Sequence, residues 1–147
     1  MSRATAEGRI LIVDDESAIR LVCRLNLDSA GFHTLEAADG ETALALARSE
    51  HPDLILLDVM LPGIDGWRVA EQLAASPETR EIPILFLSAR AERSDDARGH
   101  EAGGLGYITK PFDPEDLISL VRDVLDRTER GEHDALRREW RQRLGHD

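Results

Sequence analysis

The chain has 147 residues and a formal net charge of -11, with 29 acidic residues against 18 basic ones. No apolar run approaches the roughly 20 residues of a membrane-spanning helix, and this excess of acids opposes binding to nucleic acid through its phosphates. We expect one globular, cytoplasmic domain, because the length suits a single domain and the one cysteine, Cys23, has no partner for a disulfide or a zinc site.

Three apolar runs of strand length occur in chain order, at residues 10–13, 54–57 and 84–87. Each run is continuous rather than alternating, which is typical of strands buried on both faces of a parallel sheet. Two weaker strand candidates lie at Phe32–Glu36 and Gly106–Thr109.

Helix-like stretches separate these runs, and several begin at capping residues. Asp39 can cap one helix, and Asp113 with Pro114 supplies the N-cap and first residue of another. The predicted helices are Ser17–Ala30, Gly40–Ser49, Gly66–Ala75, Ser94–Ala102 and Pro114–Leu125. Because strand and helix alternate five times, the sequence predicts a doubly wound α/β sheet with helices on both faces.

The composition changes after Asp126, where a near-neutral, arginine-rich tail begins at residue 127. Leu136, Trp140 and Leu144 recur every four residues there and form one narrow apolar stripe on a short helix. Such a helix is marginal alone in water, so the stripe needs a surface in this domain, in a second subunit or in a partner. We expect helix packing or homodimerisation rather than DNA contact, because acids are interleaved with the arginines.

Polar side chains follow the predicted strands at their carboxyl ends. They are Asp14 with Asp15, Asp58, Ser88 and Lys110. Any one of them alone would most often be a turn or cap residue, but parallel strands bring all of them to the edge where open α/β sheets bind ligands. Lys110 is the one lysine beside seventeen arginines, and a compact ammonium is not replaceable by a planar guanidinium in a crowded acidic site.

The chemistry of this set indicates phosphoryl transfer. Carboxylates so close together repel one another unless a cation lies among them, and Mg²⁺ suits one or two carboxylates plus water. Asp58, alone at the end of the central strand, can then attack a phosphoryl group and form an aspartyl phosphate. Lys110 would offset charge on the phosphoryl oxygens, and the Ser88 hydroxyl would donate a hydrogen bond to one of them.

Four stretches of the chain resemble the receiver domains of two-component response regulators, including the single-domain chemotaxis type. They are residues 10–16, 54–66, 87–89 and 107–112, and the likeness covers about residues 8–126 in order and spacing. The resemblance implies a receiver domain over 8–126 with a helical tail over 127–147. It also implies a flavodoxin-like, five-stranded parallel sheet with strand order 2-1-3-4-5.

The resemblance assigns roles to the strand-end residues. Asp58 would take a phosphoryl group from a histidine kinase or a histidine phosphotransfer protein, in contact with Lys110 and Ser88. Mg²⁺ would be bound by Asp15, Asp58 and the backbone carbonyl of Met60, with Asp14 helping through water.

Switching is also implied by the resemblance. The Lys110–Pro111 bond would be cis, and Ser88 and Tyr107 would be the switch pair, the hydroxyl moving toward the phosphate as the ring turns inward. This change would reshape the face of the fourth helix, fifth strand and fifth helix, which meets a downstream protein or a second copy.

Two features depart from the family pattern, and two other functions fit the sequence less well. The family often has an Ala-Asp or Asp-Asp pair before the switch aromatic, where this chain has Gly103-Gly104-Leu105-Gly106 before Tyr107. The tail is also too short for a DNA-binding output domain. A phosphohydrolase of the haloacid dehalogenase type would need a second Asp where Met60 stands. A binding module that signals without phosphorylation is disfavoured by the complete set of site residues, so we expect a signalling module without a metabolic substrate.

Overall fold

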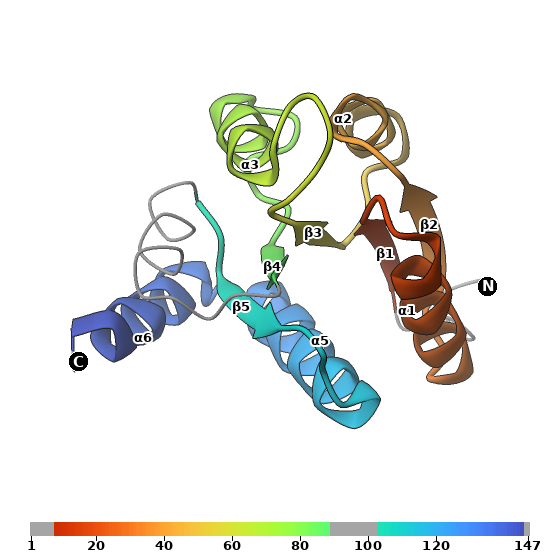
Figure 1. Cartoon of the computed structure of the whole chain (residues 1–147). Coiled ribbons are helices and arrows are strands. Elements are labelled where there is room, and N and C mark those ends of the chain that lie inside the picture. Colours follow the sequence, from red (N-terminus) through yellow and green to blue (C-terminus); the bar gives the residue numbers. More distant parts are fainter. Residues whose placement is uncertain (1–7, 89–102, 146–147) are drawn as a thin grey trace.

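The computed structural model describes residues 8–88 and 103–145. Five parallel strands form one sheet in the order β2-β1-β3-β4-β5 (Figure 1). Their bounds are β1 Arg9–Val13, β2 His33–Ala37, β3 Leu54–Asp58, β4 Ile84–Ser88 and β5 Gly106–Thr109. The predicted doubly wound sheet and its strand order are confirmed.

The three continuous apolar runs form the interior of the sheet. β3 and β4 are buried along their whole length, as is β1 after its first residue, because helices cover both faces. The register pairs Val13 with Leu57, Asp58 with Leu87, and Ser88 with Thr109. The polar residues that end these strands are therefore brought to one edge.

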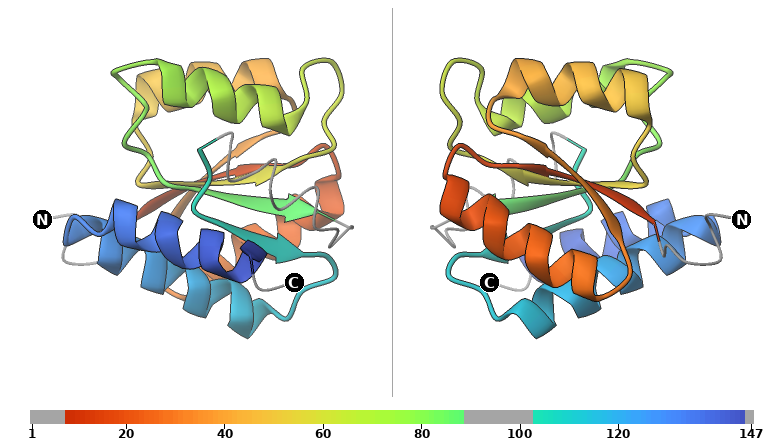
Figure 2. Two further views of the ribbon diagram at one scale, coloured as in Figure 1. Left: turned by 90° about the vertical axis from the view of Figure 1, so that its left-hand side faces the viewer. Right: turned by 90° about the vertical axis from the view of Figure 1, so that its right-hand side faces the viewer.

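In the described part of the chain, helices cover both faces of the sheet (Figure 2). α1 (Ser17–Ser29) and α5 (Pro114–Glu129) lie on one face, and α2 (Gly40–Glu50) and α3 (Gly66–Ala75) lie on the other. Aspartate side chains cap three of them, as in α2, where Asp39 accepts a hydrogen bond of 2.8 Å from the Thr42 amide. The helix expected at 94–102 lies outside the described residues.

Alternate side chains of each strand enter two apolar clusters, one on each face. Leu57 and Phe86 pack against α2 and α3, whereas Leu56 and Leu87 pack against α1 and α5. Among the described helices, none is both long and apolar enough to cross a bilayer.

The chain after the sheet differs in one respect from the sequence expectation. α5 continues to Glu129 rather than ending at Leu125, and Gly131, at a φ of +77°, turns the chain into α6 (His133–Gly145). Leu136 and Trp140 of the predicted stripe are only 7% and 3% exposed. The sequence allowed three covering surfaces, and the structure shows that the domain itself covers these two side chains. The Leu144 side chain lies outside the described part.

Candidate functional site

Three carboxylates meet at the carboxyl edge of the sheet. Asp14 and Asp15 follow β1, and Asp58 is the last residue of β3. One oxygen of each lies within 4.8 Å of the others. Asp14 and Asp58 are buried, whereas Asp15 is exposed, so the cluster opens to solvent on the Asp15 side.

Backbone amides hold the two buried carboxylates in place. The Glu16 amide donates to Asp14 Oδ1 over 2.9 Å, and the Met60 amide donates to Asp58 Oδ1 over 3.1 Å. Each carboxylate is thus tied to the loop that follows its own strand. This leaves the second oxygen of Asp58, Oδ2, directed toward the remaining charged groups of the site.

Lys110 supplies the positive charge, as the strand-end pattern predicts. Its Nζ lies 2.7 Å from Asp14 Oδ2 and 3.5 Å from Asp58 Oδ2. The exposed Glu16 carboxylate lies 3.5 Å from the same ammonium. The Lys110–Pro111 peptide bond is cis, as the resemblance implies.

The surroundings of Asp58 shift the pKa of its carboxyl group. Burial, together with the nearby Asp14 charge, raises the pKa of the Asp58 carboxyl from 3.8 to about 6, although the Met60 amide and Lys110 oppose the rise. Burial also acts to lower the pKa of Lys110, but the hydrogen bond with Asp14 and the charges of Asp58 and Glu16 raise it overall. Burial therefore outweighs the Met60 amide and Lys110 in setting the pKa of Asp58.

Ser88 ends β4, and Tyr107 is the second residue of the neighbouring β5. Ser88 is buried at the end of β4, and its carbonyl accepts a hydrogen bond of 2.7 Å from the Lys110 amide. Tyr107 is half-buried, pairs with Phe86 across the two strands, and packs against the cluster under α2 and α3. The structure thus places all the predicted strand-end residues at one edge of the sheet.

An open crevice leads to the cluster. Met60, whose side chain is 74% exposed, lines it together with Asp15, Asp58 and Lys110. Trp67 also lines the crevice, and its ring lies 4.8 Å from that of Phe86, centroid to centroid. The sequence pattern alone predicts Trp67 only as a packing residue of a helix.

Gly66 is a positioning residue whose role the sequence does not reveal, since it reads only as the start of a helix. A side chain there would overlap the backbone of Asp58 and Val59, and its amide donates to the Val59 carbonyl over 3.1 Å. The absence of a side chain lets α3 approach the end of β3. Residues 59–62 and 65 of the intervening loop line the crevice beside Asp58.

The donor set fits a hard divalent cation. Three carboxylates, two of them buried, offer oxygen ligands of the kind that Mg²⁺ prefers. Burial, and after it the Asp14 charge, raises the pKa of Asp58, and a divalent ion bound there would favour the ionised carboxylate.

The strand order and the position of the site together define the fold class of the protein. A parallel sheet in the order 2-1-3-4-5 with a site at the carboxyl ends of its strands is the flavodoxin-like, doubly wound arrangement. Within that class, the sequence model of the response regulator receiver domain matches residues 10–122. The chain belongs to the response regulator receiver domain family, whose members are signalling modules of two-component systems rather than classical enzymes. Phosphorylation and magnesium binding are typical of this family.

Curated relatives share the domain within longer proteins. The chain is 43% identical over 122 residues to the DNA-binding dual master transcriptional regulator RpaA of Synechocystis sp., covering 83% of this chain and 51% of that protein. It is 43% identical over 119 residues to the phosphate regulon transcriptional regulatory protein PhoB of Escherichia coli, covering 81% and 52%. The chain spans about half the length of these relatives.

This chain also matches solved structures of receiver proteins over nearly their whole length. A putative response regulator from Chloroflexus aurantiacus superposes with a TM-score of 0.79 at 38% identity, over 82% of this chain and 98% of that one. The chemotaxis response regulator CheY4 of Vibrio cholerae gives 0.76 at 32% identity, over 80% and 98%. Both comparisons agree with the observed fold.

Proposed function

We propose that this chain is a phosphoacceptor module that receives a phosphoryl group on Asp58 from a phosphohistidine and changes its protein contacts in response. The observation that carries the proposal is the placement of Asp58, a buried carboxylate with Lys110 at 3.5 Å, in an open crevice among two further carboxylates. The family of the chain supports it as well.

The transfer itself requires an ionised Asp58. Its Oδ2 attacks phosphorus while the bond from phosphorus to the donor histidine nitrogen breaks, and that nitrogen keeps the electron pair and takes a proton from water. Lys110 lies on the Oδ2 side, where it would neutralise charge on the transferred oxygens. The Ser88 hydroxyl would donate a hydrogen bond to one of those oxygens.

Mg²⁺ is the proposed cofactor. Asp15, Asp58 and the Met60 carbonyl would hold it, with Asp14 acting through water. Bound there, the ion would offset the charge of the carboxylates and of the phosphoryl oxygens. Asp58 would thereby stay ionised at neutral pH despite its raised pKa.

A donor protein has an apolar surface available beside the crevice. Leu21, Val22 and Leu25 are exposed on one side of α1, which begins three residues after Asp14. Met60 adds a further exposed apolar side chain from the crevice itself. We propose that a histidine kinase or phosphotransfer protein rests on this surface while its phosphohistidine reaches Asp58.

The output is proposed to pass through protein contacts. Ser88 would move toward the phosphoryl group and Tyr107 would turn inward, reshaping the face around β5 and α5 for a downstream protein or a second copy. The buried, free thiol of Cys23 accords with a cytoplasmic, reducing setting. The acidic balance of the chain gives no support for contact with nucleic acid.

The test is incubation with acetyl phosphate and Mg²⁺, followed by intact mass measurement. Wild type is expected to gain one phosphoryl group, and the gain is expected to disappear with a chelator or in Asp58→Asn. Equal labelling of Asp58→Asn would overturn the proposal. The phosphohydrolase alternative predicts turnover of phosphate monoesters, but the apolar Met60 stands where such an enzyme needs its acid.

A further inference from the structure

α6 lies beyond the stretch that matches the family, yet it completes both apolar clusters of the domain. It packs against β5 and α5 at the β5 edge of the sheet (Figure 1). Leu136 enters the cluster under α1 and α5, whereas Trp140 enters the cluster under α2 and α3. One helix therefore straddles the edge strand with a single described apolar anchor on each side.

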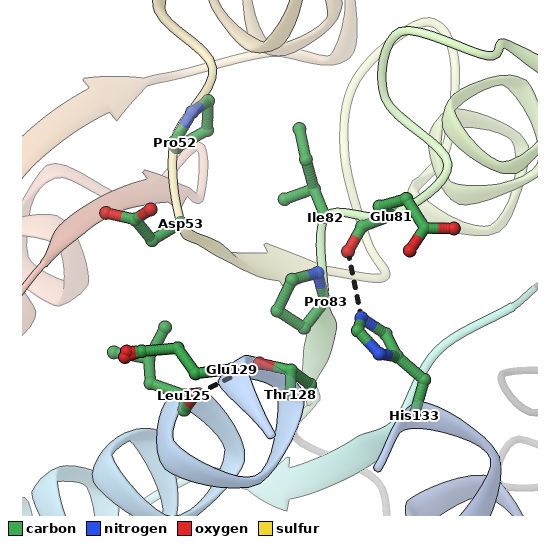
Figure 3. Close-up of a pocket in the computed structure, with 9 residues that line it drawn as sticks. All are labelled: Pro52, Asp53, Glu81, Ile82, Pro83, Leu125, Thr128, Glu129 and His133. Atoms are coloured by element: carbon green, nitrogen blue, oxygen red, sulfur yellow. Dashed lines mark hydrogen bonds between the residues drawn. The ribbon is translucent and has the colours of Figure 1, made fainter. Parts of the chain in front are cut away.

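Polar contacts also hold the described part of α6. Arg127 of α5 pairs with Glu132 at 2.9 Å and donates to Glu139 over 2.8 Å. The His133 ring nitrogen donates to the Glu81 carbonyl over 3.2 Å (Figure 3). Arg127 is largely covered and contacts both carboxylates, so these pairs tie α6 to α5, and a 13-residue helix is marginal without such contacts. The docking of α6 therefore depends on the surfaces of β5 and α5 that these side chains contact.

β5 connects this helix to the crevice. It is the shortest strand of the described sheet and hydrogen-bonds to β4 alone. Lys110 follows its last residue and is paired with Asp14 and Asp58. Three residues earlier, Tyr107 packs against the same apolar cluster as Trp140. β5 therefore joins the ammonium of the crevice to the surface that α6 covers within four residues.

We propose that α6 is a built-in cover of the β5 edge, docked while Asp58 is free and released when Asp58 carries a phosphoryl group. The inference rests on the proposed function and adds a regulatory role for the tail. A phosphoryl group brings a charge of about −1.5 to −2, which draws Lys110 away from its present pairing with Asp14. Because the anchors of α6 fit β5 in its present position, moving β5 weakens them and uncovers the edge.

Hydrogen exchange of the 147-residue chain measures the release directly. Amides of α6 are expected to exchange roughly fivefold faster or more after phosphorylation, the lower end of couplings between two sites, while amides of β1 keep their rates. Intact mass is recorded on the same samples. Unchanged α6 exchange in fully labelled protein would overturn this inference alone, whereas a chain that takes up no phosphoryl group contradicts the proposed function and this inference with it.

Reciprocity gives a second test through variants. If phosphorylation weakens docking of α6, then weakened docking must favour phosphorylation, so Trp140→Ala is expected to bind beryllofluoride with Mg²⁺, an analogue of the phosphoryl group, more tightly. Glu139→Gln, which removes the Arg127 pair without touching the core, is expected to shift affinity in the same direction by less. The matched control is Arg138→Ala on the exposed side of α6. Equal affinities in wild type, Glu139→Gln and a folded Trp140→Ala would contradict the coupling.

Discussion

At the scale of single residues, the ionised form of Asp58 lowers the stability of the folded chain. Its carboxyl is buried next to Asp14 and its pKa rises from 3.8 to about 6. A carboxyl that binds its proton more tightly in the folded chain favours folding below its raised pKa. That contribution is lost as the pH rises from about 4 through about 6. At neutral pH the buried, ionised carboxylate therefore lowers the free energy of unfolding.

We predict that Asp58→Asn stabilises the chain at pH 7 in the absence of divalent ions, by about 1 to 3 kcal/mol. The amide is close in shape to the carboxyl but carries no charge. Denaturant unfolding at pH 7 and at pH 4.5 measures the effect, and the gain is expected to shrink at the lower pH. A variant less stable than wild type at pH 7 would show that Asp58 is not electrostatically strained.

Lys110 is predicted to be irreplaceable by arginine. Its ammonium lies between Asp14 and Asp58, at 2.7 and 3.5 Å, and a guanidinium is larger and planar. Lys110→Arg is expected to fold but to be labelled by acetyl phosphate at least about tenfold more slowly, because the charge no longer meets the transferred oxygens. Wild-type labelling rates in this variant would remove Lys110 from the mechanism.

At the scale of elements, the turn from β3 into α3 depends on Gly66. A Cβ at this position would overlap the backbone of Asp58 and Val59. We predict that Gly66→Ala lowers the free energy of unfolding by about 1 to 3 kcal/mol and slows labelling, because α3 must move away from the end of β3. Chemical denaturation and mass measurement check both effects.

Gly63 supplies the matched control in the same loop. It has a φ of +74°, and a Cβ at this position would meet no atom within 4 Å; asparagine tolerates this backbone region. Gly63→Asn is therefore expected to leave stability and labelling nearly unchanged. If the two substitutions behave alike, the close contact of Gly66 is not what positions the loop.

The exposed side of α1 is predicted to serve the donor protein and not the chemistry. Leu25 is 52% exposed, so Leu25→Ser is expected to keep the fold and the rate of labelling by acetyl phosphate. Transfer from whichever histidine kinase of the same cell phosphorylates wild type fastest is expected to fall about tenfold, as for truncation of an interface anchor. Equal losses with both donors would point to damage at the site instead.

At the scale of the whole molecule, the sheet and the strand-end residues were predictable because they follow from local pattern. Continuous apolar runs mark strands buried on both faces, and the parallel order places Asp14, Asp58, Ser88 and Lys110 at one edge. The role of Gly66 was not predictable, since it depends on how closely α3 approaches β3. The packing of Trp140 was not predictable either, because a short apolar stripe does not specify which surface will cover it.

The central claim is that Asp58 is the phosphorylated residue. The most direct measurement is borohydride reduction of protein treated with acetyl phosphate and Mg²⁺, which converts an aspartyl phosphate into homoserine, followed by peptide mass analysis. Homoserine is predicted at position 58, at no other aspartate, and only when Mg²⁺ is present. Conversion at Asp14 or Asp15 instead, or label that survives on another residue type with Asp58 intact, would contradict the account.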